Sequence, residues 1–154
     1  TNLTLPSRLS FGGGIGEPRK WFVGAEYTME NTSKFSNPIF SVDNATFVNA
    51  SNFAVGGFYV PDYNSFSNYW KRVTYRVGFN FGNTGLKINN EDINEFGMSF
   101  GVGLPVGGFF SNANAGFEFG KRGTTNQNLI QENFMNFRLS LSLNDRWFQK
   151  IKYN

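Results

Sequence analysis

The chain contains no cysteine and no histidine among its 154 residues. The absence of cysteine excludes a disulfide, a thiolate nucleophile and a cysteine metal site. The absence of histidine removes the commonest general base and the commonest metal ligand. The remaining carboxylates are not accompanied by a nucleophile motif. We therefore expect no enzymatic activity, no catalytic residue, no metal site and no cofactor.

Charge and long apolar runs are also scarce. Charged residues make up 16% of the chain, against about 25% in soluble domains, and no segment approaches the roughly 20 apolar residues of a spanning helix. The net charge is +3 and the mean hydropathy is −0.35. The basic residues are scattered and lie on the face opposite the aromatic residues, so we expect no nucleic-acid binding. The segment Thr1 to Gly16 lacks the basic start and compact apolar core of a signal peptide, which predicts a mature chain or part of one.

Aromatic residues and glycine are abundant, with 19 Phe and 18 Gly. The segment from Val73 to Gly82 shows how they are arranged, because every odd position is apolar and every even position is polar or glycine. Side chains of a strand point alternately to opposite faces, so this segment predicts a strand with one apolar face. The Gly12–Gly16 cluster lacks the Lys-Ser/Thr and the helix of a phosphate-binding loop, and we interpret it as a strand end.

The same alternation recurs along the chain and predicts about seven strands. They cover residues 3–15, 20–30, 51–60, 73–82, 95–104, 112–120 and 133–144. Each is close to the roughly 9–11 residues that cross a bilayer at a tilt. Few charges, many aromatic residues and strands of this length are typical of a transmembrane antiparallel β-barrel. We treat residues 1–154 as a single domain.

The connections between these strands alternate in length. Residues 17–20, 61–68 and 105–110 form the shorter connections, and residues 31–50, 83–94 and 121–132 form longer polar ones. Outer-membrane barrels have short periplasmic turns and long external loops. An odd strand count then places the first residue outside, and an open sheet edge cannot face lipid. We therefore expect the chain to be the carboxy-terminal part of a larger barrel.

Three stretches resemble a known family. Leu5 to Gly14 leads into Trp21 to Tyr27, Phe53 to Tyr59 precedes Val73 to Phe79, and Gly97 to Pro105 leads to Phe117 to Gly123. Their order resembles the later half of the FadL-like outer-membrane transport proteins, as found in Bacteroidetes. The resemblance implies the last seven strands of a fourteen-stranded barrel, and passive uptake of hydrophobic molecules such as long-chain fatty acids. It also implies a second branch, in which the barrel is a partner or scaffold of the type 9 secretion complex.

Two groups of side chains are candidates for functional roles. The first consists of charged residues expected to face the barrel lumen, as a polar track or as mutually neutralising charges, and we favour the second interpretation: Arg8, Glu26, Arg76, Glu95, Glu118 and Arg138. The second consists of aromatic residues near strand ends, which we expect to form a girdle at the lipid headgroups: Trp21, Tyr27, Tyr59, Trp70, Tyr75 and Trp147.

The expected location is the outer membrane of a Gram-negative bacterium. Expected partners are membrane lipid and lipopolysaccharide, the latter near the basic segment Lys121–Arg122–Gly123, together with a hydrophobic ligand or an outer-membrane protein. We favour a solvated charge pair over lipopolysaccharide binding for that basic segment. A soluble β-sandwich that binds a ligand or carbohydrate is the third interpretation. It would require the apolar face of the sheet to pack against a second layer.

Overall fold

The computed structural model describes residues 6–34, 44–107 and 110–143. Their strands are β1 (Arg8–Glu17), β2 (Trp21–Glu30), β3 (Ala45–Phe47), β4 (Ala50–Tyr59), β5 (Thr74–Ile88), β6 (Glu91–Pro105), β7 (Phe110–Arg122) and β8 (Glu132–Leu143). Three short 3₁₀ turns join them, η1 (Thr32–Lys34), η2 (Tyr69–Arg72) and η3 (Asn126–Asn128). Within these residues, no helix is long and apolar enough to cross a membrane.

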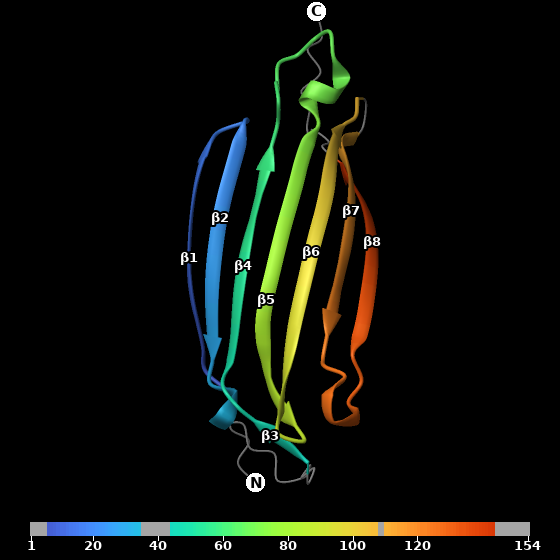
Figure 1. Ribbon diagram of the computed structural model, residues 1–154. Coiled ribbons are helices and arrows are strands. Elements are labelled where there is room, and N and C mark those ends of the chain that lie inside the picture. Colours follow the sequence, from blue (N-terminus) through green and yellow to red (C-terminus); the bar gives the residue numbers. More distant parts are fainter. Residues whose placement is uncertain (1–5, 35–43, 108–109, 144–154) are drawn as a thin grey trace, which may run out of the picture.

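All the strands belong to one antiparallel sheet in the order β1-β2-β4-β5-β6-β7-β8, with β3 paired to β5. Figure 1 shows that the sheet bends around its long axis, with β1 set behind β2 at one edge and β8 behind β7 at the other. In the described part of the chain, β1 and β8 do not pair with each other. The expected all-β antiparallel architecture is thus confirmed, whereas the sheet is open and not closed into a barrel.

The seven expected strands correspond to β1, β2 and β4 to β8. The first is shifted, because β1 begins at Arg8 and ends at Glu17, and residues 3–5 of the expected strand lie outside the described residues. The pairing registers place apolar residues of one strand beside apolar residues of the next. One such row crosses the whole sheet: Ile15, Val23, Gly57, Val77, Phe100, Phe117 and Phe137.

The expected loop over residues 83–94 is wrong. β5 and β6 continue through this segment and meet at a tight turn in which Asn89 and Asn90 both have positive φ, 50° and 68°. Two consecutive left-handed residues match the right-handed twist of a hairpin, and asparagine tolerates this conformation. The segment is polar because this end of the hairpin extends beyond the neighbouring strands. There β3 pairs with β5.

A register shift between Asn83 and Lys87 allows the hairpin to bend at Gly85. Gly85 has φ 77°, and an added Cβ would crowd the Thr32 hydroxyl and lie 2.9 Å from the Val48 carbonyl oxygen. The Thr32 hydroxyl donates to that carbonyl at 2.6 Å, and the Gly85 carbonyl accepts from the Val48 amide at 2.9 Å. Glycine is needed here for both its conformation and its small size.

The described residues form a single layer. Their only buried hydrophobic side chains are Val60, Val73 and Ile93. The accessible surface is 12097 Å², against about 7,900 Å² expected for a compact chain of this mass. Among the described residues, no second sheet or helix packs against the apolar face, whereas a sandwich would cover it with one.

Candidate functional site

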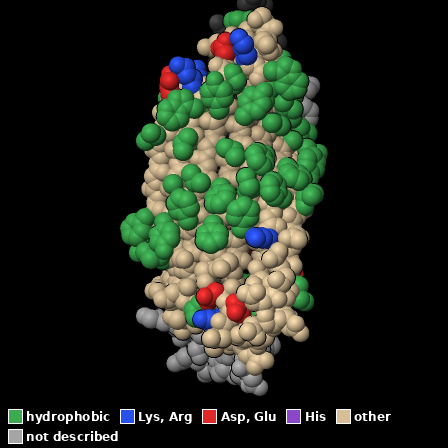
Figure 2. Space-filling view, in the orientation of Figure 1, with side chains coloured by type: hydrophobic (Ala, Val, Ile, Leu, Met, Phe, Trp, Pro, Cys, Tyr) green, Lys and Arg blue, Asp and Glu red, His purple; other side chains and the backbone are tan. Residues whose placement is uncertain are grey.

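The apolar face of the sheet is its convex face. Figure 2, in the orientation of Figure 1, shows hydrophobic side chains spread over the middle of this face, with most of the charged side chains near its two ends. Phe137 and Leu139 on β8 and Ile15 on β1 are 66–72% exposed. A ten-residue strand is about 33 Å long and covers about 25 Å when tilted by about 40°, the height of a barrel's lipid-facing band.

Aromatic rings organise the centre of this apolar face. The Phe79 and Phe96 rings meet edge to face with centroids 5.0 Å apart, and those of Phe100 and Phe119 are stacked at 6.2 Å. Gly57 and Ala115 leave a shallow apolar hollow of about 780 Å³ between larger side chains. Cross-strand aromatic pairs of this kind stabilise a sheet by roughly 0.5–1.5 kcal/mol each.

The concave face is lined by glycine and small polar residues. Gly14, Gly24, Gly56 and Gly78 form one row across β1, β2, β4 and β5. Large neighbours lie flat over such glycines: the Phe22 ring covers Gly14 and Gly24. The Asn80 side chain likewise lies against Gly97 on the adjacent strand. Glycine on this face therefore makes room for bulky side chains that converge as the sheet bends.

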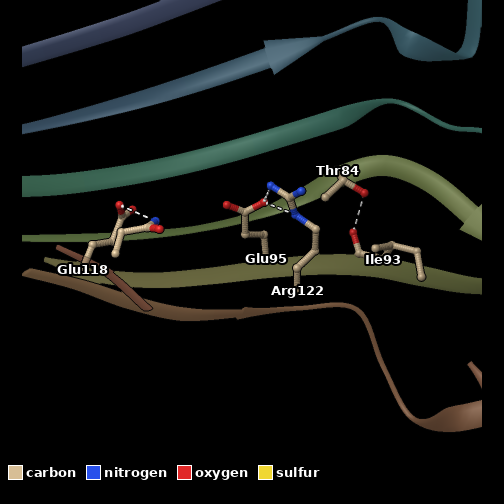
Figure 3. Close-up of polar contacts among 6 residues, drawn as sticks. Thr84, Ile93, Glu95, Glu118 and Arg122 are labelled. Carbon is tan, nitrogen blue, oxygen red and sulfur yellow. Dashed lines mark hydrogen bonds and ion pairs between the residues drawn. The ribbon is translucent and has the colours of Figure 1, made fainter. Parts of the chain in front are cut away.

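Two of the predicted lumen carboxylates have basic partners on the concave face. Glu95 of β6 accepts from Arg122 of β7, with Nε–Oε2 at 2.6 Å, and the two side chains point toward each other in Figure 3. Glu118 accepts from Asn136 at 3.3 Å, and its carboxylate lies 4.0 Å from the Arg138 guanidinium. Glu95 and Arg122 thus form a close ion pair, whereas Glu118 and Arg138 stand at the limit of one; the choice between mutual neutralisation and a polar track stays a prediction.

The other predicted lumen charges lie apart from these pairs. Glu26 accepts from the Thr28 hydroxyl at 3.1 Å, and Thr28 is bonded in turn to Ser10 at 2.8 Å. Arg76 donates to Asn114 at 3.1 Å. Arg8 starts β1 opposite Glu30. All six charged residues lie on the same face of the sheet. That this face lines a lumen stays a prediction.

The predicted aromatic girdle is divided between the two ends of the sheet. Trp21, Tyr59 and Tyr75 form a continuous row on the apolar face next to the short turns, and the Tyr75 hydroxyl donates to the Trp70 carbonyl at 3.2 Å. Tyr27 lies toward the other end, paired with Phe11 and Phe53. Trp147 lies outside the described residues.

The connection from Val60 to Val73 contacts the other two short turns, at residues 17–20 and at Pro105, and we call the three together the platform. The Val60 amide donates to the Lys20 carbonyl at 2.6 Å, and the Arg19 guanidinium lies 5.2 Å from the centre of the Tyr63 ring. At the other side, the Tyr69 hydroxyl donates to the Pro105 carbonyl at 3.0 Å. Val60, Ser65 and Val73 are buried beneath the loop, so the platform has a packed base.

The platform carries four basic residues, Arg19, Lys20, Lys71 and Arg72, and two acidic ones, Glu17 and Asp62. Lys20 lies 2.6 Å from the Glu17 carboxylate, and the hydrogen bond and the opposite charge raise the pKa of Lys20. Phe66, at the tip of the loop, is fully exposed.

Sequence reasoning missed three features of this arrangement. Phe22 and Phe58 stack on the concave face with centroids 6.1 Å apart, although the alternation identifies only Phe58 as an exception to the polar pattern there. Arg122 is the ion-pair partner of Glu95, which the antiparallel register alone reveals. The platform contains aromatic residues at positions 63, 66, 69 and 70, and this clustering was the available signal.

The arrangement offers surfaces with distinct chemical character in the described part of the chain. No group of three or more carboxylate, histidine or cysteine side chains is placed to hold a metal ion among those residues. What the sheet presents is an exposed apolar band, a concave face of paired charges and an aromatic, basic end. Exposed apolar surface of this extent is typical of a face that contacts another molecule.

No curated protein matches the chain, and no solved structure does either. The resemblance to FadL-like transporters is wrong, because the family whose model matches is a different one, BamG, over residues 1–154. Glycine–aromatic alternation occurs wherever a curved strand has one apolar and one crowded face, so it does not distinguish such families. The chain belongs to the BamG family and is associated with the bacterial outer membrane.

Proposed function

We propose that this chain forms part of the wall of an outer-membrane β-barrel, and that the barrel is a non-catalytic subunit of the barrel assembly machinery. The observation that carries the first half is the continuous, exposed apolar band on the convex face. In water, burial of such a band is worth about 25 cal/mol per Å², so the face requires an apolar environment. Hydrocarbon chains of a bilayer supply it.

The open edges of the sheet support the same proposal. β1 and β8 each present one row of unpaired backbone groups in the described part of the chain. An unpaired N–H or C=O group in hydrocarbon costs several kcal/mol, so a membrane sheet must close on further strands. We therefore propose that further strands pair with β1 and β8 and complete a barrel around this sheet.

The role in assembly rests on the family. The family name points to the barrel assembly machinery. This role agrees with the scaffold alternative of the sequence analysis in its general form, a barrel that partners another outer-membrane complex. Transport of fatty acids and membership of the type 9 secretion complex are not part of the proposal.

Affinity purification of the full-length tagged protein from native outer membranes tests the proposal. We expect it to be extracted only with detergent and to bring down subunits of the barrel assembly machinery. Depletion is expected to lower the levels of several unrelated outer-membrane barrels. Fatty-acid uptake, divided by the amount of transporter barrel that remains, is expected to stay normal. Release by salt or high pH without detergent, or recovery without any assembly subunit, would contradict the proposal.

A further inference from the structure

The tip of the platform between Val60 and Val73 presents an aromatic side chain that the fold itself does not use. Phe66 is fully exposed, although hydrogen bonds hold together the loop that carries it. The Asp62 amide donates to the Lys71 carbonyl at 2.8 Å, and the Trp70 amide donates to the Asn68 side chain at 3.1 Å. An aromatic group held in the open on a loop that is already hydrogen-bonded loses less conformational entropy when a partner covers it than one on an unstructured segment.

We propose that this loop is a docking element for a periplasmic protein subunit of the assembly machinery, with Phe66 inserted into an apolar pocket bordered by carboxylates. This inference rests on the proposed function, which supplies the machinery. The short-turn end of an outer-membrane barrel faces the periplasm. The platform carries four basic residues against two acidic ones, so we expect acidic residues around the partner's pocket.

A protein partner fits Phe66 better than the membrane does. The row of Trp21, Tyr59 and Tyr75 marks the level of the headgroups at this end. The chain continues past Tyr59, and Figure 1 shows the connection between β4 and η2 rising beyond the ends of the neighbouring strands. Small polar residues flank Phe66 on both sides, namely Asn64, Ser65, Ser67 and Asn68. A single aromatic side chain in such a setting is typical of an interface anchor.

The test compares Phe66→Ala with Ile130→Ala in the full-length protein. Ile130 is also highly exposed, but it lies in the connection between β7 and β8 at the opposite end of the sheet. We expect Phe66→Ala to lower the recovery of assembly subunits about tenfold, as for an interface anchor, and Ile130→Ala to leave it unchanged. Lys71→Glu should also lower recovery. All three variants should reach the outer membrane at wild-type levels, because none of the three side chains is buried.

A photo-crosslinking amino acid placed at position 66, and separately at 130, identifies what lies against the loop. A covalent adduct between position 66 and an assembly subunit, absent at position 130, is the expected result. An adduct with lipid at position 66, or undiminished recovery with Phe66→Ala, would overturn the inference alone. If the wild-type protein recovers no assembly subunit, the proposed function fails and this inference fails with it.

Discussion

The two faces of the sheet differ in how much room the bend leaves for their side chains. On the convex face, side chains diverge, so Phe53, Val77 and Phe81 stay exposed although their strands have neighbours on both sides. On the concave face, side chains converge, so glycines of one strand accommodate bulky side chains of the next, as Gly14 does for Phe22. The difference shows that small residues on the concave face permit the curvature of the sheet. Apolar residues on the convex face determine which surroundings that face requires.

The largest expected effect comes from placing a charge on the convex face. Phe137 lies near the middle of β8, on the apolar face, and an arginine at the bilayer midplane costs about 2–4 kcal/mol in a barrel. We expect Phe137→Arg to lower the free energy of unfolding by this amount, measured by urea titration of the full-length protein in lipid vesicles. Ser140→Arg, on the concave face of the same strand, is the control and should change it little. Equal effects of the two variants would show that lipid does not contact the convex face.

Two adjacent glycines provide a smaller and more local comparison. An added Cβ at Gly13 on the convex face meets nothing within 4 Å, whereas at Gly14 it would crowd the Phe22 ring and approach the Val23 carbonyl oxygen to 2.9 Å. Gly13→Ala should therefore be neutral or stabilising by up to about 1 kcal/mol, and Gly14→Ala should destabilise by about 1–3 kcal/mol. Unfolding titrations under the same conditions measure both. A destabilising Gly13→Ala with a neutral Gly14→Ala would reverse the assignment of the faces.

The smallest effects concern the ion pairs of the concave face. Glu95 is the less exposed partner, and its 2.6 Å bond to Arg122 contrasts with the 4.0 Å separation of Glu118 and Arg138. A double-mutant cycle with Glu95→Gln and Arg122→Met should give a coupling free energy of about 0.5–1 kcal/mol. The cycle for Glu118 and Arg138 should give a value near zero. A larger coupling in the second pair would show that the concave face is drier than its glycine lining indicates.

Much of the sheet could be predicted from the sequence because strand alternation is a local property. The expected segment 20–30 corresponds to β2, and the apolar residues chosen for 95–104 lie in register with those of β5. The hairpin at Asn89 and Asn90 was missed because its polar residues mimic a loop. Strand β3, three residues long, is too short to show a period. Neither could be found from composition.

The candidate site was less accessible to sequence reasoning. The charges on one face were identified, but the partner of Glu95 depends on which residue of β7 lies opposite it. The family was also misjudged, since the alternation that suggested it is shared by curved sheets of many kinds. The exposed position of Phe66 depends on how the loop folds over the short turns, which involves Lys20 and Pro105 from distant parts of the chain.

The sequence by itself determined the strands, their apolar and polar faces and the absence of thiol and imidazole chemistry, because each follows from residue identity and a two-residue period. Only the tertiary structure decided the registers, the convex position of the apolar face, the ion pairs and the platform at the short-turn end. These depend on contacts between residues far apart in the chain, and a local pattern carries no information about which strand, or which turn, will lie beside it.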